Sequence, residues 1–175
     1  MYGSTMEIET PVIPRTALRL VRLQRGGELD ALFMEAMTRV FKWSKVFEGN
    51  PHALVREVMG LYEQRSPLVA VWLAVEPTTD GGYTIKGHAL GQVLAYEGRY
   101  VAWVNQVVMD EPAGLILKDT FLDAVDDWVR QINLVNQASG TKINEVMMVT
   151  QRETRAWLRH AGFHLYRSIY RKGVE

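Results

Sequence analysis

Hydrophobic positions in the first third of the chain predict one strand followed by two helices. The run 18–23 has the apolar content of a short strand. Apolar residues then recur at three- and four-residue spacing over 28–42, which predicts an amphipathic helix. Asn50 is a typical helix cap, and Pro51 fits the first helical position that follows it. The second helix therefore begins there, and we expect it to end before Ser66, which precedes a proline.

The middle of the chain predicts three antiparallel strands. Strand-like runs cover 68–76, 84–96 and 100–109, and short glycine-containing turns at 80–82 and 97–99 separate them. Because such short connections can join only antiparallel neighbours, the three runs form successive hairpins. The third run is apolar on both faces, so we expect it to be an interior strand of the sheet.

The last third predicts a long helix, a strand, a shorter helix and a final strand. The long helix spans about 114–138, and its apolar face consists of Leu117, Phe121, Val125, Trp128, Ile132 and Val135. A fifth strand over 143–149 leads into a capping box that starts at Thr150, and the helix it opens ends at Gly162. A last strand covers 163–172. This order indicates an α/β (α+β) fold with a mixed, mostly antiparallel central sheet flanked by helices.

Length and composition indicate one folded domain with an N-terminal arm. The 175 residues are 47% hydrophobic, which is enough for a single core over 18–175. Residues 1–17 form an irregular arm, because Pro11 and Pro14 interrupt regular structure. Twenty basic and twenty acidic residues balance, so the charge gives no support for a nucleic-acid partner.

The sequence also argues against a membrane span and a metal site. No apolar run reaches the roughly 18 residues that a transmembrane helix needs. The chain has no cysteine, and its four histidines do not form a metal-ligand set. We therefore expect a protein of the cytoplasm that acts without nucleic acid, membrane or metal.

The segment from Arg155 to Phe163, Arg-Ala-Trp-Leu-Arg-His-Ala-Gly-Phe, resembles the helix before the last strands of the GNAT superfamily, the GCN5-related N-acetyltransferases. The element order over 18–172 is similar to the same fold. This resemblance implies a cleft where neighbouring strands separate, acetyl-CoA as cofactor, and transfer of an acetyl group to an amine. The chain resembles a divergent member of this superfamily.

The divergence concerns the loop that holds the cofactor pyrophosphate between the fourth strand and the third helix. GNAT proteins usually carry Gln/Arg-x-x-Gly-x-Gly/Ala there, but this chain has Asp110, Glu111, Pro112 and then a single glycine, Gly114. A carboxylate about 4–6 Å from a phosphate charge costs on the order of 3–4 kcal/mol at an effective dielectric near 20. That repulsion weakens binding by roughly two orders of magnitude, and Lys118 compensates only in part.

The resemblance places the site residues as follows. It assigns cofactor contacts to Val107, Val108, Met109, Gly114 and Lys118, and catalytic roles to Glu111, His160 and Tyr166. Leu158 stands where many family members have a proton-donating tyrosine, so His160 and Tyr166 are the alternatives for that role. Glu111 is a general base or a first-turn acid that stabilises the helix dipole. His160 is a proton donor or a capping cation of its helix.

Two polar residues interrupt the apolar third strand of the hairpins. Asn105 and Gln106 either belong to a β-bulge or line the cleft at which the strands separate, and the sequence does not decide between these alternatives.

Two functions follow from these observations. The first is an acetyl-CoA-dependent N-acetyltransferase, or a descendant of one, with weak or lost activity. The second is a non-catalytic assembly protein that binds no cofactor, such as a virion component of a tailed phage, which would place it in the virion. In that case other protein subunits are the expected partners, bound through Val12 and Ile13 of the arm. The alternative is that the arm docks on its own domain.

Overall fold

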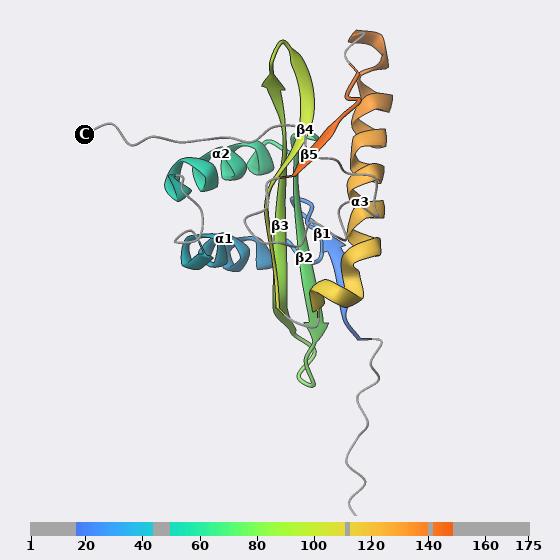
Figure 1. The fold of residues 1–175 in the computed structure, drawn as a ribbon. Helices are drawn as coiled ribbons and strands as arrows, with labels where there is room; N and C mark the ends of the chain where they lie inside the picture. Colours follow the sequence, from blue (N-terminus) through green and yellow to red (C-terminus); the bar gives the residue numbers. More distant parts are fainter. Residues whose placement is uncertain (1–16, 44–49, 111–112, 140–141, 149–175) are drawn as a thin grey trace, which may run out of the picture.

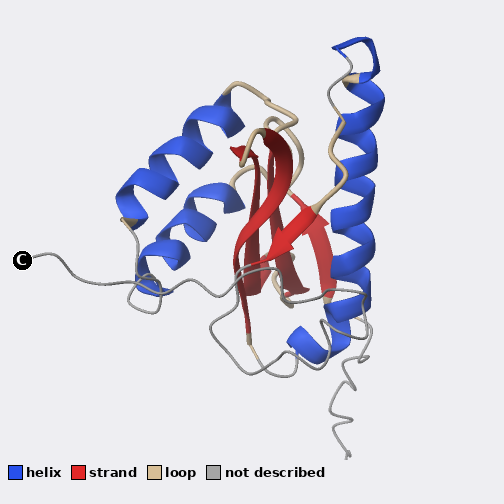
Figure 2. Cartoon of the chain, turned by 45° about the horizontal axis from the view of Figure 1, so that its top comes forward, coloured by secondary structure: helices blue, strands red, loops and turns tan. Residues whose placement is uncertain are grey.

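The structure, a computed structural model, describes residues 17–43, 50–110, 113–139 and 142–148. A central sheet lies between two helical layers (Figure 1). Helices α1 and α2 cover one face, and the long helix α3 covers the other, as the turned view in Figure 2 shows. The fold is thus a three-layer arrangement of the kind that the hydrophobic pattern predicts.

The sheet has five strands, and their order in space is their order in the sequence. They are β1 (Arg19–Arg22), β2 (Val69–Pro77), β3 (Tyr83–Tyr96), β4 (Arg99–Met109) and β5 (Val146–Met148). The first four strands pair antiparallel, and β5 pairs parallel to β4. The predicted mixed, mostly antiparallel sheet is therefore confirmed, and so is the interior position of β4.

A two-residue turn joins β3 and β4. Glu97 and Gly98 both have positive φ, 49° and 79°, which is the backbone of a tight hairpin turn that follows the natural twist of the strands. Glycine adopts this conformation without a steric penalty. The turn fixes the register in which Tyr96 lies opposite Arg99, and this register continues to the pair of Gly91 with Val104.

Three α-helices complete the described fold: α1 (Leu32–Trp43), α2 (Pro51–Glu63) and α3 (Ala113–Val135), with a short 3-10 helix η2 (Gln137–Ser139) after α3. Asn50 caps α2 as predicted, because its side-chain oxygen accepts hydrogen bonds from the His52 and Ala53 amides. The first helix begins at Leu32 and not at residue 28.

The late start of α1 has a local cause in the side chain of Asp30. Its carboxylate pairs with Arg25 at 2.7 Å, accepts the Gly26 amide at 3.1 Å and accepts the hydroxyl of Tyr62 at 2.7 Å. These bonds hold the residues before Leu32 in turns, so the apolar spacing that starts at Leu29 does not become helix there.

The α3 face of the sheet is closely packed and apolar. Trp72 meets Phe121 and Trp128 edge to face, with ring centroids 5.6 and 5.4 Å apart. Gly91 makes room for these rings, because a Cβ there would lie 2.8 Å from Trp128 and 3.0 Å from Trp72. The predicted apolar face of α3 is confirmed from Leu117 to Ile132. Val135 is the exception, since it is 70% exposed beyond the edge of the sheet.

The opposite face of the sheet packs against α1 and α2. Its core includes Phe33, Met37 and Val40 of α1, Val55 and Val58 of α2, and Val71, Leu73 and Leu90 of the strands. Three polar side chains are buried in the described structure, His88, Gln92 and Gln106, and the strand register places all three on this face. The predicted short helix after Thr150 and the last strand lie outside the described residues, as does the arm.

Candidate functional site

A β-bulge divides strand β4 at Asn105. The register places Leu90 opposite Gln106 and Gly91 opposite Val104, so Asn105 is the extra residue. Ala102 and Val104 face the α3 core before the bulge, and Val107 and Met109 face it afterwards. The one-residue insertion therefore keeps the apolar positions on one side, and Asn105 takes the bulge alternative of the two left open by the sequence.

The described pairing of β4 with β5 lies before the bulge. Within the described residues, the parallel ladder joins Ala102–Val104 to Val146–Met148. Strand β4 continues to Met109, and the residues that follow Met148 lie outside the described residues. Backbone N–H and C=O groups at the end of a strand are natural partners for the amide groups of an extended ligand. Val107, Val108 and Met109 are the residues of β4 that lead to the N-terminus of α3.

Close contact between strands fixes the end of β4. A Cβ at Gly87 would lie 2.7 Å from the Val108 carbonyl oxygen and 2.8 Å from the Met109 Cα atom. Backbone cannot give way as a flexible side chain does, so glycine is required for this approach. The Asp110 amide then donates to the Lys86 carbonyl at 2.8 Å, which continues the contact one residue past β4.

The N-terminus of α3 follows directly, and its first turn is only partly free to bind an anion. The Gly114 amide donates to the Asp110 carbonyl oxygen at 3.2 Å, so this N–H group is already used. Ala113 is buried, whereas Leu115, Ile116 and Lys118 are exposed. A phosphate at this helix end would meet the exposed cation of Lys118 and the helix dipole, but one amide fewer than a free helix terminus offers.

Arg39 of α1 reaches across to this junction. One Nη atom donates to the Ile85 carbonyl oxygen at 2.9 Å, and the other lies 3.6 Å from an Asp110 carboxylate oxygen. The Asp110 side chain is 45% exposed, and that of Arg39 is 19% exposed. The charge of Asp110 is therefore partly balanced by a neighbouring cation, which reduces the repulsion that the sequence suggested for a phosphate.

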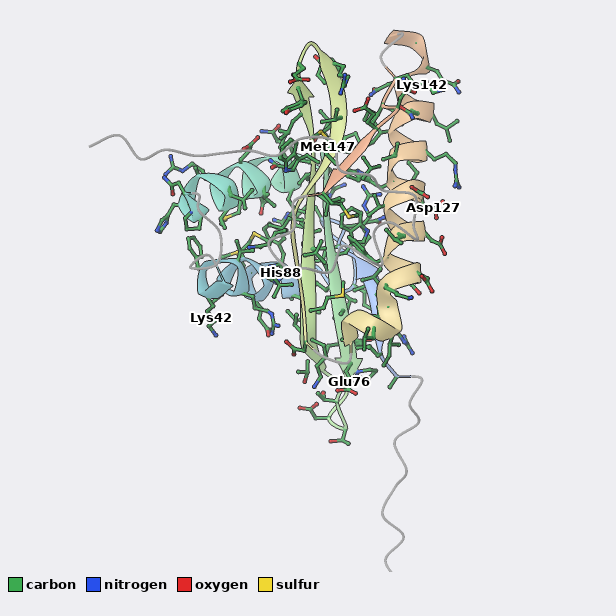
Figure 3. All side chains as sticks on the ribbon, viewed as in Figure 1. Lys42, Glu76, His88, Asp127, Lys142 and Met147 are labelled. Atoms are coloured by element: carbon green, nitrogen blue, oxygen red, sulfur yellow. The ribbon has the colours of Figure 1, made fainter. Side chains whose placement is uncertain are left out.

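A buried polar pair lies behind the bulge on the α1/α2 face. Gln106 Oε1 accepts a hydrogen bond from His88 Nε2–H at 2.7 Å, and both side chains are almost completely buried. Figure 3 shows His88 beside the sheet on the side of α1. Burial, opposed by the bond to Gln106 and reinforced by the charge of Arg39, lowers the pKa of His88 to about 4. The imidazole is thus neutral at physiological pH.

Two buried atoms in this cluster lack a partner within the described part of the chain. They are His88 Nδ1, an acceptor when Nε2 carries the proton, and Arg39 Nε, a donor. Each unsatisfied group lowers the free energy of unfolding by about 1–3 kcal/mol. Their presence in the core therefore indicates that this region is not optimised for stability alone.

The structure brings together some of the residues that the resemblance assigned. Val107, Val108 and Met109 form the end of β4, and Gly114 and Lys118 follow in the first turns of α3. The proposed catalytic residues Glu111, His160 and Tyr166 lie outside the described residues.

Arg39 and the His88–Gln106 pair were not predicted as site residues. For the pair no simple signal existed in the sequence, because regular counting outward from the 97–98 turn places His88 and Gln106 on opposite faces, and only the bulge brings them to one face. For Arg39 there was none, because its partners belong to distant elements.

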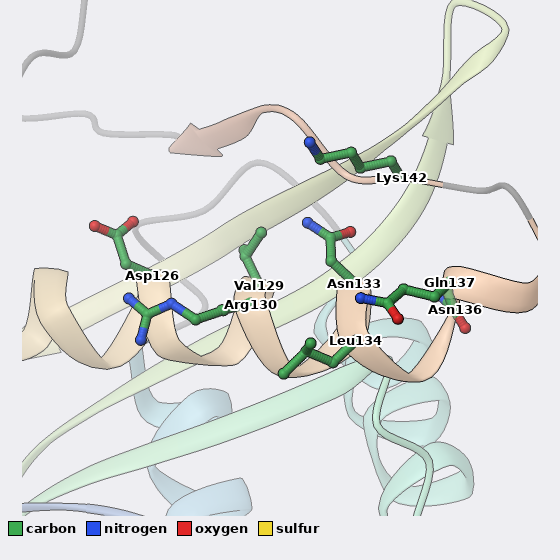
Figure 4. Close-up of a pocket in the computed structure, with 8 residues that line it drawn as sticks. All are labelled: Asp126, Val129, Arg130, Asn133, Leu134, Asn136, Gln137 and Lys142. Atoms are coloured by element: carbon green, nitrogen blue, oxygen red, sulfur yellow. The ribbon is translucent and has the colours of Figure 1, made fainter.

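A separate open hollow of about 640 Å³ lies along the C-terminal half of α3, away from this junction (Figure 4). Its walls include Asp126, Arg130 and Leu134 of α3 and Lys142 from the segment before β5. Asn133 ties that segment to the helix, since its side chain donates to the Ile143 carbonyl oxygen and accepts the Ile143 amide, at 2.8 and 2.7 Å. The hollow is a surface groove where α3 meets the segment before β5.

Across the described ranges, no three His, Asp or Glu side chains converge as metal ligands would. None of the helices found there combines the length and hydrophobicity needed to cross a bilayer.

Comparison with known proteins relates this architecture to acetyltransferases. No protein-family profile and no curated protein sequence matches the chain. Among solved structures, a predicted acetyltransferase with acetyl-CoA from Clostridium acetobutylicum is similar, with a TM-score of 0.60 and 12% identity over 89% of this chain and 96% of its own. Glucosamine-6-phosphate N-acetyltransferase from Arabidopsis thaliana gives 0.56 and 10%, over 90% of this chain and 99% of its own.

A putative acetyl transferase from Pyrococcus furiosus gives a TM-score of 0.53 and 10% identity, over 89% of this chain and 100% of its own. At these identities the similarity concerns the fold alone. The chain has the mixed α/β fold of GNAT acetyltransferases, as its element order implied.

Proposed function

We propose that this protein binds an acyl-CoA thioester, such as acetyl-CoA, against the end of β4. We infer that its N-acetyltransferase activity is weak or has been lost. One observation carries this proposal: β4 is bulged at Asn105, and its last residues lead directly to the N-terminus of α3. The similarity to a structure titled as an acetyltransferase with acetyl-CoA supports the choice of ligand.

The residues fit the two ends of such a ligand unequally. The backbone of Val107 to Met109 suits the extended, amide-containing arm of CoA, because strand edges pair with extended chains. The pyrophosphate end fits less well, since the Gly114 amide already donates to Asp110 and a carboxylate stands at the helix terminus. Arg39 and Lys118 supply positive charge in partial compensation. We infer weak binding and not its complete loss.

The chemistry would follow from the ligand and from how this chain orients it. Acetyl-CoA supplies an activated thioester whose carbonyl carbon an amine can attack. The rigid end of β4 would orient the ligand, because Gly87 and the Asp110–Lys86 bond hold that strand in place. Asp110 is the exposed carboxylate nearest to this strand end among the described residues. Glu111, His160 and Tyr166 stay predictions for the proton transfers.

Calorimetric titration with acetyl-CoA tests the proposal. We expect measurable binding at a dissociation constant on the order of 0.1–1 mM, which stabilises the protein against heat at millimolar ligand. The double substitution Asp110→Asn, Glu111→Gln should tighten binding by about tenfold, because it removes negative charge near the phosphates. Asp126→Asn and Asp127→Asn on the far half of α3 are matched controls that should leave the affinity unchanged. Absence of binding by both the wild type and the double variant would refute the proposal.

A scaffold role in a protein assembly is the second candidate, and exposed apolar side chains on α3 favour it. Leu115, Ile116, Leu134 and Val135 are 74%, 56%, 60% and 70% exposed, which is unusual for four large apolar residues of one helix. Sedimentation distinguishes the roles. Association that is lost on Leu134→Gln, Val135→Gln or on deletion of 1–14, in a chain that binds no acetyl-CoA, would favour the scaffold, with a virion component as one example.

A further inference from the structure

Apolar packing alone does not explain why the polar pair His88 and Gln106 is buried in the core. Gln106 is the residue directly after the bulge, and it is only 2% exposed. Its partner His88 is 0% exposed and comes from the neighbouring strand. Two apolar side chains of similar volume would fill this space without desolvating four polar atoms.

The register of β4 explains what the pair does. Without the bulge, Asn105 would lie opposite Leu90 and every following side chain would change face. Gln106 would then point into the apolar α3 core beside Trp128, and Val107 and Met109 would leave it. The hydrogen bond from His88 to Gln106 exists only in the bulged register. It therefore stabilises the bulge against a one-residue slip.

The neighbouring contacts make this bond rigid. Arg39, which acts on the charge state of His88, is itself held by the Ile85 carbonyl oxygen. Leu73 and Val108 flank His88 on the two adjacent strands. The imidazole is thus enclosed by α1, β2 and β4. A substitution at His88 is therefore expected to change the packing at the end of β4, because the ring is not surrounded by solvent.

We propose that His88 is a positioning residue, which acts through Gln106 to hold the end of β4 in the bulged register that presents its backbone to acyl-CoA. This inference rests on the proposed function for its ligand. The predicted effect of His88 on the register of β4 does not depend on the proposed function, and it can be measured without any ligand.

The test uses variants of the full-length chain that separate the hydrogen bond from packing. His88→Leu, Gln106→Leu removes both polar partners and leaves neither unpaired, so this double variant is expected to fold. His88→Gln places an amide N–H near the position of Nε2 and should preserve the bond to Gln106. Val58→Ala creates a cavity in the same core at a distance from β4, and it is the control for general loss of stability.

Hydrogen exchange followed by mass spectrometry and calorimetry with acetyl-CoA give the two readouts. In the double variant we expect amide exchange in 104–109 to accelerate by about tenfold or more, and the dissociation constant for acetyl-CoA to rise by about tenfold. His88→Gln should stay within about threefold of the wild type in both. Val58→Ala should lower the melting temperature without changing the affinity or the local exchange of β4 relative to the rest of the sheet.

The outcomes separate this inference from the proposed function. Unchanged exchange in 104–109 of the double variant would overturn the positioning role whatever the ligand result. Faster exchange with an unchanged dissociation constant would overturn the link between register and binding. A wild-type chain that binds no acetyl-CoA refutes the proposed function and the ligand half of this inference, but the exchange measurement still decides the role of His88 in β4.

Discussion

The two faces of the sheet are built differently. On the α3 face, Trp72, Phe121 and Trp128 pack edge to face with small residues such as Ala89 and Ala102 between them. On the α1/α2 face, an equally buried layer contains His88, Gln92 and Gln106, and Arg39 reaches into it. The first arrangement buries mainly apolar groups, although the Trp72 indole N–H is also buried there without a partner among the described residues. The second arrangement buries several polar side chains at defined places.

This difference indicates which face carries function. Buried polar groups reduce stability unless they are fully paired, so a core that retains them in one region has another requirement there. The polar groups of the α1/α2 face gather around the bulge and the end of β4, where the strand meets α3. The α3 face thus serves mainly stability, and four measurements test this division.

The largest effect is expected on the α3 face from Trp128→Ala. Trp128 is 0% exposed, and its indole N–H also donates to the Pro67 carbonyl oxygen at 2.8 Å. The substitution should lower the free energy of unfolding by about 3–5 kcal/mol, because a large cavity is left in a rigid core. Urea denaturation gives this value. Leu134→Ala on the same helix, at a 60% exposed position, should change it by less than about 0.5 kcal/mol. A similar small loss for Trp128→Ala would contradict the packing described.

The next effect concerns Gly91, which faces the same rings. In Gly91→Ala the new methyl group would lie 2.8 Å from the Trp128 ring, so we expect a loss of about 1–3 kcal/mol from overpacking. The same substitution in a Trp128→Ala background should cost less, because the cavity then accommodates the methyl group and only the contact with Trp72 at 3.0 Å is still close. Equal losses in both backgrounds, measured by urea denaturation in a double-mutant cycle, would show that the two residues do not compete for space.

On the α1/α2 face, acid should destabilise the protein through His88. Its pKa is lowered to about 4 in the folded state, whereas an unfolded histidine titrates near 6.5. The unfolded state therefore binds more protons below pH 6.5, and stability present above that pH is lost as the pH falls toward 4. Between pH 7 and pH 5 the loss should be about 2 kcal/mol.

His88→Gln is the matched control for this titration, because glutamine does not ionise in this range. Its unfolding free energy should depend less on pH between 7 and 5 by the same amount. Parallel pH profiles of variant and wild type would mean that His88 is protonated in the folded state too, and that the polar pair is not enclosed.

The smallest effect belongs to a local contact of the α1/α2 layer. Asn50→Ala removes the cap that accepts the His52 and Ala53 amides, which should cost about 1 kcal/mol in thermal or urea unfolding. Asn50→Gly should cost only a few tenths of a kcal/mol, because it leaves the amides open to water. If both variants lose the same amount, the side-chain bond is not what stabilises the start of α2.

Local sequence signals predicted the strands and turns well, because turn chemistry fixes the register of hairpins. The expected runs 84–96 and 100–109 correspond to β3 (Tyr83–Tyr96) and β4 (Arg99–Met109). The interior position of β4 and the burial of Trp128 also follow from local apolar content, and both are confirmed. The predicted start of α1 at residue 28 was wrong. Apolar spacing gives no information about a side chain such as Asp30, whose hydrogen bonds hold the residues before Leu32 in turns.

The site was less predictable because its contacts join elements that are distant in sequence. Nothing near Arg39 indicates that its guanidinium will bond to Ile85 and lie beside Asp110. The acidic loop suggested repulsion of a phosphate, and only the fold shows the compensating cation. The bulge was one of two alternatives for Asn105 and Gln106. The structure supports the bulge, because Val104 and Val107 both face α3 although they are three residues apart in one strand.

The parallel strand β5 has a consequence for the order in which the chain folds. Strands β2, β3 and β4 pair through short turns, but β5 reaches β4 only after the whole of α3 has been traversed. Contacts so distant in sequence form late, because a long loop must close before they can form. During refolding, the outer side of β4 is therefore exposed while its inner side is already paired. We expect dilute conditions to raise the refolding yield, because an open strand edge of one chain can pair with that of another.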